Sequence, residues 1–363
     1  MLTALVILFS IVYATTFATL IYGWVRLVDF KPSGKMSQDL TLTVVVACRN
    51  EAMKLPQLLD ALANQTCSNF DIVLVNDHSS DTTLEIMNNA IARFNHLSVI
   101  NSDKPGKKQA LRAGILVSKS ELILTTDADC MPCPTWVETF LHYFQQHPSD
   151  MIIGPVSIQP QKSLFSQLQC LEFASMVASG GGAASIHRPI LCNGANLGFL
   201  KSVWLRCQSE LRMDILSGDD MFLLQSIKRR GGSIRFLKSP KAMVESTATD
   251  TIRDFINQRI RWASKSAAYT DEQIIAVSLI VMSVCIMLVG LGITSLFYRP
   301  AIYQWSVLFF TKLLIDGFFV TRFTSFFNIK NPVINTLVLS MIYPFYVTYI
   351  GLHGLFAKQI VWK

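Results

Sequence analysis

Long uncharged apolar blocks and shorter alternating runs divide the chain into a membrane-like part and a soluble-like part. Residues 1–25 and 274–297 contain no charged residue. Each is longer than the roughly 20 residues that a helix needs to cross the hydrocarbon core of a membrane. Two further apolar segments follow at 301–320 and 332–356. The pattern predicts a transmembrane helix at 1–25, 274–297 and 332–356, and a transmembrane or interfacial helix at 301–320.

The 301–320 segment is the ambiguous one because it contains two charged residues. Lys312 and Asp316 stand at the i,i+4 spacing of a helix. Such a pair closes on itself facing other helices when the segment spans the membrane. Alternatively, the segment lies along the membrane surface as an amphipathic helix. The sequence leaves both arrangements open.

Basic residues indicate how the predicted spans are oriented. Arg26, Lys31 and Lys35 follow the first block, and Arg322 and Lys330 separate the last two. Positive charge marks the cytoplasmic ends of spans, so we expect the N-terminus outside and the middle of the chain in the cytoplasm. The first block lacks the basic leader and cleavage site of a signal peptide and is expected to remain as an anchor. The expected location is a multi-pass one, in the inner membrane of a bacterium.

Residues 41–270 carry the alternation that is typical of a soluble domain. Strand-like apolar runs begin at 42, 71, 97 and 122, and segments with helical spacing or a helix cap lie between them. Four alternations of strand and helix predict an α/β fold with a parallel central sheet. We therefore expect one cytoplasmic catalytic or binding domain at 41–270, flanked by the membrane helices.

Polar residues follow the predicted strands at the points where ligands bind in parallel sheets, outside the carboxyl ends. Asp127 and Asp129 end the fourth run, and in an extended chain residues i and i+2 face the same side. Taken alone, the pair is also typical of a turn at a strand end. Two carboxylates this close share a proton or hold a cation. Mg²⁺ or Mn²⁺ is the expected ion if a diphosphate is present.

Composition and charge narrow the class further. Of 363 residues, 51% are hydrophobic and 16% charged, and the net charge is +7. We assign that charge to membrane lipids and phosphate groups, because no basic and aromatic face for nucleic acid is found. Phosphate contacts are expected from four basic residues, for which a solvated loop is the alternative: Arg49, Lys104, Lys107 and Lys108. The eight cysteines are expected to be reduced thiols, with Cys130 and Cys133 as bystanders.

Six motifs in order resemble the family 2 glycosyltransferases. They are ACRNE, VNDHSSD, GKKQALRAG, DAD, GDD and QRIRW, between about residues 42 and 262. The resemblance implies a GT-A fold and an inverting hexosyltransferase. Such an enzyme moves a sugar from a UDP-sugar to a lipid or polysaccharide acceptor at the cytoplasmic membrane face and forms a β-glycosidic bond. The alternatives are a processive polysaccharide synthase and, from another class, a non-catalytic membrane scaffold that binds nucleotide-sugars.

The resemblance also assigns roles to residues of the donor site. Asp77 is implied to recognise the uracil or ribose of the UDP-sugar, and residues 47–51, with Arg49 and Glu51, to line the nucleotide. Asp127 is implied to contact the donor and Asp129 to coordinate the cation. Lys107 is expected at the donor from its charge, as a phosphate contact.

The later motifs concern the base and the acceptor. The family's usual Glu-Asp pair here reads Asp219 and Asp220, with Asp220 as the candidate base. Gln258, Arg261 and Trp262 form the QxxRW signature, and the resemblance implies contacts with the donor diphosphate and the acceptor. Asn196 is the expected acceptor contact in its loop. The small-residue stretch at 179–185 is expected to be a flexible loop.

Overall fold

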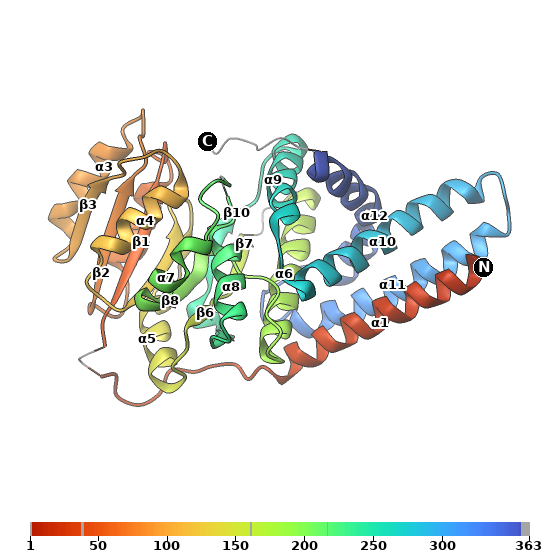
Figure 1. The fold of residues 1–363 in the computed structure, drawn as a ribbon, viewed down its shortest axis with the longest axis horizontal. Coiled ribbons are helices and arrows are strands. Elements are labelled where there is room, and N and C mark those ends of the chain that lie inside the picture. The colour runs from red at the N-terminus through yellow and green to blue at the C-terminus, as the bar shows by residue number, and fades with distance from the viewer. Residues whose placement is uncertain (1, 38–39, 160–161, 216, 357–363) are drawn as a thin grey trace. The chain divides into compact units, whose positions relative to one another are not determined.

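The structure is a computed structural model that describes residues 2–37, 40–159, 162–215 and 217–356. The chain forms two compact units (Figure 1). The helical unit contains the described parts of Met1–Leu27, Pro160–Ile190 and Ala248–Gln359. The sheet unit contains the described parts of Val28–Gln159 and Leu191–Thr247. Each unit is treated below by itself.

The sheet unit is built on a mixed, mostly parallel sheet of seven strands in the order β3-β2-β1-β4-β8-β6-β9. Strand β8 pairs antiparallel with β4 and β6, while the other neighbours are parallel. The four strands predicted from the sequence are β1 to β4, and their carboxyl ends lie at one edge. The strands are β1 Leu42–Cys48, β2 Phe70–Asn76, β3 Leu97–Asn101, β4 Leu122–Asp127, β6 Met151–Ile153, β8 Leu197–Leu200 and β9 Ile234–Phe236.

A smaller sheet and several helices complete this unit. The small sheet has the order β5-β10-β7, with strands β5 Met131–Pro132, β7 Val156–Gln159 and β10 Val244–Thr247. The α-helices are α2 Leu55–Ala63, α3 Thr83–Ala90, α4 Lys107–Val117, α5 Trp136–Gln146, α7 Lys201–Cys207 and α8 Asp219–Arg229. Short 3₁₀ turns lie at η1 Ile91–Arg93, η2 Gly194–Asn196, η3 Gln208–Glu210 and η4 Pro240–Ala242.

Close packing of α4 on the sheet fixes the start of that helix beside the strand ends. All seven residues of β1 are buried, as the uninterrupted apolar run predicts for a strand covered on both faces. Gly114 of α4 lies so near the sheet that a Cβ there would stand 2.5 Å from Val45 Cγ1. The missing side chain at Gly114 therefore lets α4 lie directly against the sheet. This close packing holds the first residue of α4, Lys107, beside the carboxyl ends of the strands.

The helical unit consists of long helices, among which the predicted spans appear. The helices are α1 Leu2–Arg26, α6 Leu164–Ser185, α9 Ile252–Ser264, η5 Ser266–Ala268, α10 Glu272–Ser295, α11 Ala301–Phe323 and α12 Pro332–Phe356. Within the described residues, three helices are long and apolar enough to cross a membrane: Leu2–Arg26, Glu272–Ser295 and Pro332–Gly354. They correspond to the predicted spans at 1–25, 274–297 and 332–356.

Helix α11 runs beside α1 in the same direction (Figure 1). Near the start of both helices, Gln304 Nε2 donates to Thr3 Oγ1 at 3.0 Å. Near their ends, Trp24 Nε1 donates to the carbonyl oxygen of Arg322 at 3.0 Å. The contacts therefore extend along almost the whole of α1.

The charged pair of α11 is closed and faces α1. Lys312 and Asp316 form an ion pair, and Tyr13 OH donates to Asp316 Oδ1 at 2.6 Å. Lys312 is buried, and its ammonium also lies 4.7 Å from the ring centroid of Tyr343 on α12. The pair thus closes on itself and faces other helices, while α11 is not among the three helices apolar enough to cross a membrane. The placement of 301–320 across the membrane or along its surface stays a prediction.

The small-residue stretch at 179–185 is the end of α6, so the expectation of a flexible loop was wrong. A Cβ on Gly182 would lie 2.2 Å from the carbonyl oxygen of Leu20 on α1. Ser185 Oγ donates to the carbonyl oxygen of Gly23 at 2.6 Å. Glycine disfavours an isolated helix, but small residues allow two helix backbones to approach closely. Tertiary packing therefore decided the structure of this stretch.

Candidate active site

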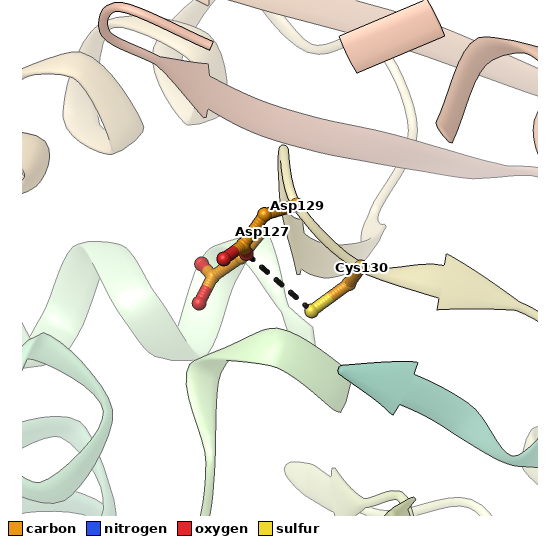
Figure 2. Close-up of side chains that lie close together, drawn as sticks. All are labelled: Asp127, Asp129 and Cys130. Carbon is orange, nitrogen blue, oxygen red and sulfur yellow. Dashed lines mark hydrogen bonds between the residues drawn. The ribbon is translucent and has the colours of Figure 1, made fainter. Parts of the chain in front are cut away.

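Two of the predicted acidic residues meet where β4 ends. Asp127 is the last residue of β4 and Asp129 lies in the turn that follows. Ligand atoms of Asp127, Asp129 and Cys130 all lie within 4.8 Å of one another, and Figure 2 shows the three side chains gathered at one point. The turn and the carboxylate cluster are thus the same feature, because the turn brings the second aspartate back toward the first.

The two carboxylates suit a hard divalent cation, whereas the thiol does not. Burial raises the pKa of the Cys130 thiol well above its ordinary value, and the charges of Asp127 and Asp129 raise it further. A neutral thiol is a poor ligand, since metals bind the thiolate. Mg²⁺ and Mn²⁺ prefer oxygen ligands and commonly take one or two carboxylates together with phosphate oxygens. Asp127 and Asp129 fit that donor set, and the role of Cys130 as a bystander stays a prediction.

Lys107 connects this cluster with the second acidic motif. Its Nζ lies 2.5 Å from Asp127 Oδ1. Burial by itself would lower the pKa of Lys107, but the charge of Asp127, followed by those of Asp219 and Asp220, outweighs it and raises the pKa above its ordinary value. The side chain therefore carries a positive charge among three carboxylates. The sequence placed Lys107 among the phosphate ligands but did not foresee this contact with the acids.

Asp219 and Asp220 are held at the N-terminus of α8. They are its first two residues and follow Gly218, whose φ of 83° is left-handed. Asp220 Oδ2 accepts a hydrogen bond from the backbone N–H of Gly194 at 3.1 Å. The carbonyl oxygen of Gly194 in turn accepts from Thr125 Oγ1 of β4 at 2.7 Å. The turn η2 thus ties the candidate base to the strand that ends in Asp127.

Asp77 is fully buried at the end of β2. Its Oδ1 accepts from the backbone N–H of Gly106 at 2.8 Å, which fixes the residue before Lys107. Its Oδ2 lies 3.7 Å from Arg49 Nη1 and accepts no hydrogen bond from the described residues. Buried polar atoms are nearly always satisfied. Among the described residues, this oxygen is satisfied by the ion pair with Arg49.

The loop after β1 contributes one contact that the sequence reasoning missed. Glu51, a predicted nucleotide-lining residue, donates its backbone N–H to Thr83 Oγ1 at 2.8 Å and so joins the loop to α3. Lys54 Nζ, at the start of α2, lies 3.4 Å from Asp129 Oδ2. The only signal for Lys54 was its place beside the ACRNE motif.

Two expected ligand contacts have structural roles instead. Asn196 is fully buried, donates to the carbonyl oxygens of Pro155 and Ala242 at 2.7 and 2.8 Å, and accepts from Trp136 Nε1 at 2.9 Å. It has no exposed atom to offer an acceptor, so that expectation was wrong.

Lys108 likewise differs from the phosphate contact that was expected. It is buried and donates to the carbonyl oxygens of Leu211 and Arg212 at 3.2 and 2.8 Å. Consecutive residues of a helix point about 100° apart, so its ammonium cannot share the direction of Lys107. It supports the segment that leads into α8.

The QxxRW residues lie on α9 of the helical unit, on a helix as predicted. Gln258, Arg261 and Trp262 are all half-buried. Arg259 lies between Gln258 and Arg261 in the sequence. It donates through Nη1 to Gln258 Oε1 at 2.6 Å and so fixes the side chain of Gln258. The sequence analysis gave Arg259 no role, because the motif leaves its position open.

Comparisons with known proteins identify the family and the fold of the chain. Residues 43–183 match the family described as Glycosyl transferase family 2, and residues 122–352, more than half of the chain, match Glycosyl transferase family group 2. The fold is that of a mannosyltransferase from Pyrobaculum calidifontis solved in complex with GDP-Man and Mn²⁺. That comparison has a TM-score of 0.54, 14% identity, and covers 98% of this chain and 97% of the other.

Curated relatives match part of their own length. A poly-beta-1,6-N-acetyl-D-glucosamine synthase of Staphylococcus aureus is 23% identical over 240 residues, which are 64% of this chain and 56% of the synthase. The chain thus spans about half the length of that relative. Glycosyltransferase GlyG of Streptococcus pneumoniae is 32% identical over 114 residues, covering 31% of this chain and 38% of GlyG. With its α/β GT-A fold, its ordered acidic motifs and these matches, the chain belongs to glycosyltransferase family 2 and is an enzyme of that family.

Proposed function

We propose that this glycosyltransferase moves a sugar from a UDP-sugar to a lipid or polysaccharide acceptor at the cytoplasmic membrane face, with inversion at the anomeric carbon. The observation that carries the proposal is the arrangement around Lys107. Its ammonium contacts Asp127 and is held electrostatically by Asp219 and Asp220. A candidate cation site and a candidate base therefore share one positively charged neighbour at the carboxyl edge of the sheet.

The donor side of the proposal uses the residues of β1, β2 and β4. Asp127 and Asp129 hold Mg²⁺ or Mn²⁺, which when bound neutralises charge that develops on the departing diphosphate. Asp77 Oδ2 accepts the imide N–H of uracil in place of its ion pair with Arg49, and an acceptor at this point suits a uridine nucleotide. Arg49 and Lys107 supply positive charge for the phosphates, and Glu51 lines the nucleotide.

The acceptor side uses Asp220 as the general base. The acceptor hydroxyl oxygen forms a bond to the anomeric carbon while the bond from that carbon to the UDP oxygen breaks. The hydroxyl proton passes to the Asp220 carboxylate. Hydrogen bonds from the N–H groups of Gly194 and Met221 fix this carboxylate. A single displacement of this kind inverts an α-linked donor to a β-glycoside, and Asp219 supports the site through its charge.

Gln258, Arg261 and Trp262 complete the proposal on the basis of the QxxRW motif. By the resemblance of this motif, Gln258 and Arg261 reach the donor diphosphate and the acceptor site, with Trp262 beside them. The motif is i,i+3 spaced on α9, so its polar residues project from one side of the helix.

The test measures release of the nucleoside diphosphate by the full-length protein in detergent, with Mn²⁺ or Mg²⁺, from a panel of UDP-sugars and from GDP-mannose. UDP-N-acetylglucosamine comes first, because a matched synthase is named for a polymer of that sugar. We expect turnover with at least one donor and a loss of about 100-fold or more in Asp220→Asn, since general base catalysis contributes about 10²–10⁴-fold. Asp60→Asn, an exposed carboxylate on α2, is the matched control and is expected to be unaffected.

Two outcomes would contradict the proposal. Binding of donors without turnover would favour the nucleotide-sugar-binding scaffold. Turnover with GDP-mannose alone would exclude the uridine nucleotide. With a radiolabelled donor, label in the organic phase indicates a lipid acceptor, and label in an aqueous polymer indicates a processive synthase, the alternative that the similarity to the Staphylococcus aureus synthase favours.

A further inference from the structure

A buried ion pair links α9 to another helix of the helical unit. Arg259 of α9 and Glu172 of α6 are each 5% exposed. Arg259 Nη2 is in close contact with Glu172 Oε2, and Arg259 Nε donates to Glu172 Oε1 at 3.3 Å. Removing two charges from water is costly, and the attraction between them compensates only when the geometry is good. The bidentate contact of a planar guanidinium with a carboxylate provides such geometry.

The same carboxylate also binds a residue of α12, one of the helices apolar enough to span a membrane. Tyr346 OH donates to Glu172 Oε1 at 2.7 Å. Glu172 thus accepts hydrogen bonds from α9 and from α12, while its own backbone belongs to α6. Three helices of this unit are joined at one buried side chain.

Arg259 also contacts both ends of the QxxRW motif. Its Nη1 donates to Gln258 Oε1 at 2.6 Å, and its guanidinium carbon lies 4.3 Å from the ring centroid of Trp262, within cation–π range. Phe173, the neighbour of Glu172 on α6, has its ring centroid 6.1 Å from that of Trp262. The residues that the ion pair brings together therefore surround the motif.

In this arrangement, the residue that orients the motif is different from the motif residues that a ligand can reach. Arg259 is almost completely buried and its donors are directed to Glu172 and Gln258, so it is badly placed to contact a substrate. Gln258 and Trp262 are half-buried and keep surface that a ligand can reach. A glutamine side chain has several rotamers of similar energy, and a hydrogen bond from a fixed guanidinium selects among them before a ligand arrives.

We propose that Glu172 and Arg259 are positioning residues for Gln258 and Trp262, and that Tyr346 makes this positioning depend on α12. The inference rests on the proposed function, in which Gln258 reaches the donor diphosphate and the acceptor site, with Trp262 beside it. It adds a specific cause for their orientation. The guanidinium must be planar and forked to reach Glu172 and Gln258 at once, which a lysine ammonium cannot do.

The test compares steady-state UDP release by Arg259→Met, Arg259→Lys and Tyr346→Phe with the wild type, in detergent and with the best donor. Arg259→Met is expected to lower kcat/KM at least tenfold, and Arg259→Lys is expected not to restore it. Tyr346→Phe keeps the ion pair and almost the whole side-chain volume, so it folds even if the arginine variants do not; we expect a two- to fivefold loss. Arg253→Met, an exposed arginine of the same helix, is the matched control.

A double-mutant cycle distinguishes positioning from general stabilisation. In the Gln258→Ala/Trp262→Ala background, Arg259→Met is expected to cost less than threefold, because the residues that it positions are gone. Equal costs in both backgrounds would overturn the proposal, as would a folded Tyr346→Phe protein with wild-type kcat/KM. Absence of turnover in the wild type would instead refute the proposed function, so the two failures are distinguishable.

Discussion

The replacement Asn196→Leu tests whether the amide of Asn196 holds the fold or binds the acceptor. In the structure it satisfies three buried groups: the indole N–H of Trp136 and the carbonyl oxygens of Pro155 and Ala242. Leucine keeps the approximate volume but removes the partner of the Trp136 indole N–H and of the Ala242 carbonyl oxygen, whereas the Pro155 carbonyl oxygen keeps its hydrogen bond from Val244 N–H. An unsatisfied buried polar group costs about 1–3 kcal/mol, so two of them should lower the unfolding free energy by about 2–6 kcal/mol.

The assay is thermal unfolding of the full-length protein in detergent, followed by tryptophan fluorescence, to which the buried Trp136 contributes. For a unit of this size, about 1 kcal/mol corresponds to a shift of about 2–4 °C in Tm. We therefore expect the transition of the sheet unit to fall by about 6–12 °C for a loss of about 3 kcal/mol.

Asn193→Ala is the matched control, because Asn193 is the N-cap of η2 and its Oδ1 accepts one hydrogen bond from Ala195 N–H. It should lose about 1 kcal/mol, the usual cost of a lost cap. The reasoning would be refuted if Asn196→Leu melted within about 2 °C of the wild type while its KM for the acceptor rose. A shift that small corresponds to no more than a single hydrogen bond, about 1 kcal/mol.

Three further substitutions probe contacts that are specific to the fold. Gly114→Ala places a Cβ 2.5 Å from Val45 Cγ1 and should lower the Tm of the sheet unit by overpacking of about 1–3 kcal/mol; an unchanged or raised Tm would mean that α4 can move outward. Gly182→Val should separate α6 from α1, because even a Cβ at this position would lie 2.2 Å from the carbonyl oxygen of Leu20. The protease susceptibility of the helical unit should then rise, and unchanged susceptibility would contradict the close packing of the two helices. Lys108→Met should release the segment before α8, and kcat should fall more than donor binding; equal effects on both would argue for a direct phosphate contact.

The sequence by itself determined the class of the fold and the location of the acidic residues. Uninterrupted apolar runs such as 42–48 bury both faces of a strand, and their alternation with helices permits few topologies other than a parallel-type sheet. Asp77 and Asp127 then had to lie at the same edge, because carboxyl ends of parallel neighbours coincide. The membrane helices followed from length and apolarity alone.

Tertiary structure decided what the side chains at these places contact. Lys107 and Lys108 are adjacent and chemically identical, yet one faces the acids and the other is buried against backbone carbonyls. Their helix fixes which side each takes, and nothing local in the sequence distinguishes them. In the sequence, Asn196 similarly resembles a polar loop residue. In the structure, its amide is hydrogen-bonded to the indole N–H of Trp136 and to two carbonyl oxygens.

The helical unit shows the same division. Local propensity predicted a loop at 179–185, but close approach to α1 made glycine favourable within a helix. The pairing of Arg259 with Glu172 joins residues 87 positions apart, a separation at which one sequence contains no pairing signal. Periodicity and composition act over a few residues and are readable from the chain, whereas partners in space depend on how the elements pack, which only the folded structure provides.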